Sequence, residues 1–292
     1  MGRGRKKIIP RCERIILGEE IGKENCGEIP ITPLRKYYLK LKKASVGHQA
    51  SECDRLSNAV DELASLFLES HKAFSVYRNI TEKFYENSNR KEPKNPVIRA
   101  FDSLGMEGRS IQVRDTQYRF FYRDREISPL RTRASTFSDG ESGRSSGLGG
   151  IDYIAHTIGQ TVRPVLGEVK CGAEKTPYYA FIQLLTYFCE MSTPNQITRA
   201  DRHHTFGVKM LHRTFAKQML YDDVSFDLHI VLADYQGQEG PGSLLEKTGV
   251  LAQRFKTALA SNPDVGRFLG DVLCLKVDTG SAFDMVDLYW KS

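Results

Sequence analysis

The sequence lacks the features that would place the chain in a membrane, on a secretory route or around a metal-sulfur centre. No run of uncharged apolar residues approaches the roughly 18 that a bilayer-spanning helix needs, and the start at Met1 has no apolar signal stretch. The six cysteines include no C-x-x-C pair, which excludes the common zinc and iron-sulfur spacings. No P-loop or helicase motif is present, so the chain is not a motor by itself. We therefore expect a cytoplasmic protein with reduced thiols.

What is present is an ordinary globular composition with positive charge concentrated at one end. The whole chain carries a net charge of +6, whereas residues 1–50 hold twelve Lys or Arg against five Glu, a balance of 12 − 5 = +7. A basic segment of this kind favours polyanions through counterion release, which indicates nucleic acid as a partner. A solubilising tail is the alternative interpretation.

The first third of the chain is expected to be helical. Residues 34–43 predict a small helix, and between 52 and 87 apolar residues recur at spacings of three, four and seven. This periodicity is typical of one long amphipathic helix or of a helical hairpin. The polar run 87–96, with prolines at its end, stops the pattern. We therefore divide the chain into a basic N-terminal arm and helical region, residues 1–95, and a second domain, residues 96–292.

The second domain alternates between strand and helix patterns. Thr176 and Pro177 are a typical N-cap and first helical residue. The Ser- and Gly-rich stretch 135–150 is expected to be a mobile loop. Expected strands cover 110–127 (a strand or hairpin), 151–157, 162–171, 226–234, 272–277 and 284–290, and expected helices cover 176–191 and 244–259. The class is therefore α/β, with a mixed sheet covered by helices.

Three charged residues lie on the apolar hairpin predicted at 151–171. Asp152 begins its first strand, and Glu168 and Lys170 lie on its second. Because strand side chains alternate, Glu168 and Lys170 share one face while Val169 turns to the core. Two carboxylates and the Val169 carbonyl would then offer oxygen ligands for one or two Mg²⁺ or Mn²⁺ ions, with the lysine near the reacting phosphate. The pattern predicts metal-dependent phosphodiester hydrolysis.

These residues resemble the PD-(D/E)XK nuclease superfamily. Gly-Ile-Asp152 stands in place of the Pro-Asp of that name, and Glu168-Val-Lys170 supplies the second half. Downstream, Gln183 and Tyr187 resemble the Q-x-x-x-Y motif of the RecB-like and lambda-exonuclease-like branch. The similarity is a match of motifs in order over roughly residues 100–235.

The resemblance implies both a fold and a set of roles. The fold is a restriction-endonuclease-like three-layer core, in which helices flank a central mixed sheet, with an N-terminal helical extension. Asp152 and Glu168 would bind metal, Lys170 would act on the attacking water, and Gln183 would belong to the catalytic set. Gln183 and Tyr187 would also contact nucleic acid. The branch commonly adds a ligand from an upstream helix, for which Glu62, Glu69 and His71 are unranked candidates.

A bland interpretation of the same residues stays open. A bare [DE]-x-K tripeptide occurs by chance, as in Glu92-Pro-Lys94, and Glu168 with Lys170 could form an ion pair on a solvated sheet. The strand context of the Glu168 motif, followed by Gln183 and Tyr187, favours the nuclease site.

The expected function is a metal-dependent nuclease that cuts DNA, in a recombination, repair or anti-phage defence setting. The alternative is a catalytically inactive protein of the same fold that binds nucleic acid or serves as an assembly subunit. The expected partner is nucleic acid and not a membrane. Partner proteins or a homo-oligomer, endonuclease or exonuclease action, and the choice of strand and sequence are left open.

Overall fold

The computed structural model describes most of the chain downstream of the basic arm. The described residues are 32–75, 93–127, 150–159, 161–172, 176–194, 196 and 225–292. The predicted arm up to residue 31 and residues 135–149 of the loop predicted over 135–150 lie outside them.

Helices and strands alternate along the chain much as the sequence patterns predict. The helices are α1 (Pro33–Leu41), α2 (Val46–Asn58), α3 (Val60–Ser75), α4 (Pro96–Met106), α6 (Pro177–Met191), α9 (Leu244–Ala260) and α10 (Pro263–Gly266). The strands are β1 (Ile111–Val113), β2 (Arg119–Ile127), β3 (Ile151–Ile158), β4 (Pro164–Cys171), β5 (Phe226–Ala233), β6 (Leu269–Val277) and β7 (Met285–Lys291).

Local capping chemistry explains where the helices begin. The Thr176 hydroxyl accepts a hydrogen bond from the Tyr179 N–H, and Pro177 follows as the first residue of α6, as predicted. Asn95 caps α4 in the same way, with Pro96 behind it, yet the sequence analysis assigned no helix there. The expected helical segment 52–87 consists of two helices as far as residue 75, because α2 ends before Ala59 and α3 starts after it. Residues 76–87 of that segment lie outside the described residues.

The strands form a closed barrel in the order β1-β2-β3-β4-β5-β6-β7, which corrects the expected three-layer fold. A sandwich of layers leaves two open sheet edges. Here β1 pairs in parallel with β7, through Gln112 with Met285 and Val113 with Val286, so the sheet closes on itself. The restriction-endonuclease-like core with a central sheet flanked by helices was therefore wrong.

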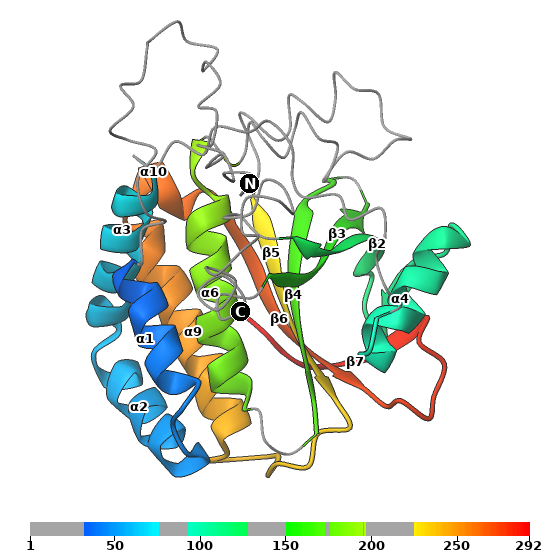
Figure 1. The fold of residues 1–292 in the computed structure, drawn as a ribbon, viewed down its shortest axis with the longest axis horizontal. Helices are drawn as coiled ribbons and strands as arrows, with labels where there is room; N and C mark the ends of the chain where they lie inside the picture. The colour runs from blue at the N-terminus through cyan, green and yellow to red at the C-terminus, as the bar shows by residue number, and fades with distance from the viewer. Residues whose placement is uncertain are drawn as a thin grey trace, which may run out of the picture.

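Two hydrophobic clusters occupy the two faces of the barrel strands. Helices α1, α2, α3, α6 and α9 lie together on the outer face, and α4 lies on the other side of the strands (Figure 1). The outer cluster takes Leu228, Ile230 and Leu232 of β5, while the inner cluster takes Val231 and Ala233. This strict alternation follows from the two-residue repeat of a strand buried on both faces.

The predicted N-terminal region and the predicted second domain share the outer cluster. Leu34 of α1, Leu56 of α2 and Phe67 of α3 pack in it together with residues of α6 and α9. Phe67, for example, has its ring centroid 5.4 Å from that of Phe188 on α6. Within the described residues, no helix is both long enough and apolar enough to cross a bilayer.

Candidate functional site

The β3–β4 hairpin brings the three predicted residues together. Tyr153 of β3 pairs with Gly167 of β4, so the next positions outward along the two strands are Asp152 and Glu168. The Asp152 Oδ2 atom accepts a hydrogen bond of 2.8 Å from the backbone N–H of Val169. The Asp152 carboxylate therefore lies against the strand that carries the other two residues.

Glu168 and Lys170 face helix α6, as their alternation with core residue Val169 predicts. Their side chains form an ion pair and are only 1% and 5% exposed, respectively. The Lys170 Nζ also donates to Gln183 Oε1 at 2.8 Å and lies 5.0 Å from the centroid of the Tyr179 ring. An ion pair on a solvated sheet, the bland interpretation, does not describe a pair at this depth.

One oxygen of Glu168, Oε2, is buried and receives no hydrogen bond from an N–H or hydroxyl group of the described residues. The Glu168 carboxyl group instead shares a hydrogen bond with the Asp152 carboxyl group, which compensates part of its desolvation. Burial, followed by the nearby negative charge of Asp152, raises the pKa of Glu168 to about 8 against the lowering effect of Lys170. Without a cation, the carboxyl pair therefore retains a proton at neutral pH.

Lys170 stays charged in this environment. Burial by itself lowers the pKa of the Lys170 ammonium, but the charges of Glu168 and Asp152 outweigh it and raise that pKa above its ordinary value. The lysine is therefore a fixed positive charge and a hydrogen-bond donor at neutral pH, not a base.

The donors at this site fit a hard divalent cation. The Val169 N–H points toward Asp152, and in an extended strand the carbonyl of the same residue points to the same side. Two carboxylates and this carbonyl match Mg²⁺, which keeps several waters and uses one or two carboxylates. In the described parts of the chain, no three Asp, Glu, His or Cys side chains come together as metal ligands, so a cation here would take only two side-chain ligands from the protein.

The three upstream candidates lie on helix α3, where none of them contacts Asp152 or Glu168 in the described structure. Glu62 forms an ion pair with Arg55, and Glu69 is exposed. The His71 Nε2 atom lies 3.4 Å from the carbonyl oxygen of Ser192. The structure therefore does not bring any of the three to the carboxyl pair.

Tyr187 lies beside the site but inside the core. Its side chain is buried, and the Arg35 guanidinium carbon lies 5.7 Å from the centroid of its ring. Arg35 in turn donates from Nε and Nη2 to the two carboxylate oxygens of Glu190, at 2.8 and 2.5 Å. In this structure Tyr187 and Gln183 contact protein groups, and the contact of both with nucleic acid stays a prediction.

Helix α1 contributes groups that the sequence analysis did not identify. The Tyr179 hydroxyl donates to the Tyr38 hydroxyl at 3.1 Å. Burial, followed by the nearby charge of Glu168, raises the pKa of Tyr38 against the lowering effects of the Tyr179 hydrogen bond and of Lys170. Tyr179, Gln183 and Tyr187 follow one another at spacings of four, so they share a face of α6. That spacing is a local signal for Tyr179, whereas nothing local indicates that α1 would pack against this face.

Comparison of the chain with protein-family models, with curated proteins and with solved structures found no match, so its function is argued from the geometry of the site.

Proposed function

We propose that the chain is a divalent-cation-dependent phosphodiesterase that cleaves DNA. The observation that carries the proposal is the close pair of Asp152 and Glu168 carboxyl groups, which share a hydrogen bond, with the charged Lys170 next to them. This grouping matches the PD-(D/E)XK motif in residue type and order. The proposal depends on the site alone, because a fold by itself does not specify an activity.

Asp152, Glu168 and the Val169 carbonyl would hold the cation. Bound Mg²⁺ or Mn²⁺ polarises a phosphodiester and lowers the pKa of a water molecule that it binds. The carboxylates would supply the negative charge that offsets the cation, and the cation would offset the burial and the Asp152 charge that raise the pKa of Glu168.

Lys170 would stabilise the negative charge that grows on the phosphate oxygens during attack by water. Because its pKa is raised, it acts as a charged donor. Gln183 accepts a hydrogen bond from the Lys170 ammonium and so holds that group in place. Tyr179 lies under the same ammonium, where the face of its ring favours a cation. These two residues are positioning residues in the proposal.

The outer side of α1, opposite the side that packs against the site, carries exposed positive charge. Lys36, Lys40, Lys42 and Lys43 are exposed on or just after the helix whose other side supplies Arg35. Lysines at such positions contact phosphates without selecting a base sequence. This surface supports DNA, a continuous polyanion, as the substrate.

The test is cleavage of linear and circular DNA by the purified chain, with and without Mg²⁺ or Mn²⁺. The variants Glu168→Gln and Lys170→Met should each reduce the cation-dependent rate at least about 100-fold, as expected for loss of one group that stabilises a transition state. Glu69→Gln removes an exposed carboxylate of α3 and should retain the parent rate.

The outcomes separate the site from the function. Cleavage that survives both Glu168→Gln and Lys170→Met would refute the site. If the parent chain retains DNA on a filter but never cuts it with either cation, the phosphodiesterase proposal fails, and the nucleic-acid-binding alternative replaces it.

A further inference from the structure

A cavity of about 360 Å³ opens at the other end of the β3–β4 hairpin from the candidate site. Thr157 and Ile158, the last two residues of β3, line the cavity, whereas Asp152 is the second residue of that strand. Thr157 lies five residue steps along the strand from Asp152, a span of about 17 Å at about 3.3 Å per residue. The cavity is therefore a separate place in the fold.

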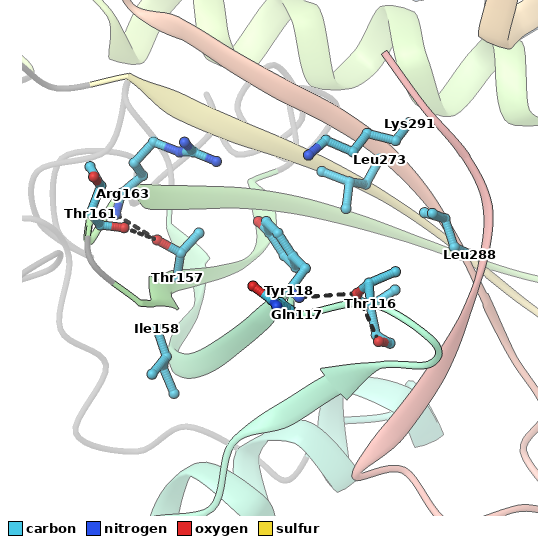
Figure 2. Close-up of a pocket in the computed structure, with 11 residues that line it drawn as sticks. Thr116, Gln117, Tyr118, Thr157, Ile158, Thr161, Arg163, Leu273, Leu288 and Lys291 are labelled. Atoms are coloured by element: carbon cyan, nitrogen blue, oxygen red, sulfur yellow. Dashed lines mark hydrogen bonds between the residues drawn. The ribbon is translucent and has the colours of Figure 1, made fainter.

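The lining of this cavity is apolar on its walls and positive at one side. Apolar side chains come from β1, β3, β6 and β7: Val113, Ile158, Leu273 and Leu288. The charged lining residues are Arg163 and Lys291, and no acidic residue is among those that line the cavity within the described structure. Arg163, Lys291 and Tyr118 point toward one another across the opening (Figure 2).

Two carboxylates behind the wall, the buried Asp227 and the partly exposed Asp271, hold the two cations in place. Arg163 Nη2 donates to Asp227 Oδ2 at 2.9 Å and to Asp271 Oδ2 at 3.1 Å, and Lys291 Nζ lies 2.9 Å from that same Asp271 oxygen. Asp227 is fully buried on the inner face of β5. The positive groups are thus fixed before any ligand arrives, which reduces the entropy lost on binding.

Below the cavity, Asp227, Tyr118, His229 and Tyr153 form one chain of hydrogen bonds, in which the Tyr118 hydroxyl and both ring nitrogens of His229 have partners. Tyr118 donates its hydroxyl proton to Asp227 Oδ2 at 2.8 Å and lies 2.8 Å from His229 Nε2. His229 Nε2 must then carry the proton and donate to Tyr118, so its Nδ1 accepts from Tyr153, 2.9 Å away. Tyr118 therefore has its polar end satisfied within the barrel, and its ring is what the cavity meets.

We propose that this cavity binds a small organic anion with an apolar or aromatic body and a single carboxylate or phosphate group. The apolar walls and the Tyr118 ring fit the apolar body of such a ligand. Arg163 and Lys291 fit its oxyanion, because the planar fork of donors on a guanidinium matches the oxygens of a carboxylate or phosphate group. A volume of about 360 Å³ falls in the size range of small-molecule sites. The proposal does not depend on the phosphodiesterase function.

The test uses 1-anilinonaphthalene-8-sulfonate, a fluorescent aromatic anion, as the probe. Its neutral analogue N-phenyl-1-naphthylamine, which lacks the sulfonate, is the matched control ligand. The sulfonate should bind the parent chain at least about tenfold more tightly, because only it can pair with Arg163 and Lys291. Displacement by benzoate or octanoate on one side and by adenosine monophosphate on the other distinguishes a carboxylate from a phosphate ligand.

Two matched variants locate the binding. Ile158→Glu places a negative charge on the cavity wall at a side chain that is 42% exposed, so folding should tolerate it, and it should weaken sulfonate binding at least about tenfold. Val250→Glu makes the same kind of change at a 45% exposed position on α9 and should leave binding unchanged. Equal affinity for the two probes, absence of sulfonate binding, or unchanged binding in Ile158→Glu would each overturn the proposal.

Discussion

Binding of a divalent cation at Asp152 and Glu168 should expel a proton from the protein at neutral pH. The pKa of Glu168 is about 8 in the cation-free protein, so the group is about 90% protonated at pH 7. A cation between the two carboxylates favours the charged form of both. Lys170, whose pKa is raised, keeps its proton throughout. The expected release is about 0.9 proton per site at pH 7, about 0.5 at pH 8 and about 0.1 at pH 9.

The assay is calorimetric titration with Mg²⁺ or Mn²⁺ in buffers that differ in ionisation enthalpy, such as PIPES, HEPES and Tris. The slope of the observed enthalpy against the buffer enthalpy gives the number of protons released. The affinity should also weaken about tenfold for each pH unit below 8, because one proton must leave for each cation bound.

Two results would refute this reasoning. One is a slope of zero at pH 7 in a parent chain that demonstrably binds the cation, as expected if an ordinary exposed carboxylate were the ligand. The other is a Glu168→Gln variant that releases as many protons as the parent. Glu69→Gln, altered at an exposed site on α3, should reproduce the parent slope.

Three further predictions concern the groups packed around the site and inside the barrel. Arg35→Met should lower the free energy of unfolding by about 3–5 kcal/mol, because it strands Glu190 in the core, and the double variant with Glu190→Leu should recover most of that loss in urea unfolding. A double variant as unstable as the single one would contradict this. The folded pKa of His229 is about 3, below an unfolded value of about 6.5, so stability should fall by about 1.4 kcal/mol per pH unit as pH drops below 6.5. His229→Asn should lack that part of the slope between pH 6.5 and 5.5, and identical slopes would count against it. In Gly167→Ala the new Cβ would lie 2.0 Å from the Tyr153 ring, so we expect a loss of about 1–3 kcal/mol in thermal unfolding, and an unchanged midpoint would show that the ring can move.

The sequence predicts those parts of the fold that local chemistry determines. The start of α6 follows from Thr176 and Pro177, and the shared face of Glu168 and Lys170 follows from strand alternation. Helix α4 carries the same cap signal at Asn95 but was not predicted. An Asn-Pro pair therefore indicates the start of a helix here as the Thr-Pro pair does at α6.

Closure of the barrel and the wider site depend on contacts between distant parts of the chain. The pairing of Val113 with Val286 joins β1 to β7, and no local pattern indicates that two edge strands will meet. Arg35 reaches Glu190 across 155 residues of sequence, so its role beside the site depends on how α1 packs. Motif spacing located the carboxyl pair, whereas the surrounding shell required three-dimensional information.

The barrel is closed by its shortest strand, β1, which pairs with β7. Strand β1 has three residues, and only Gln112 and Val113 pair with β7, while β4, β5 and β6 are joined along most of their length. Parting that seam would break few backbone hydrogen bonds and would leave the rest of the sheet intact. Because Val113 and Leu288, one from each side of the seam, also line the cavity, a molecule too large for the resting opening would gain entry there first.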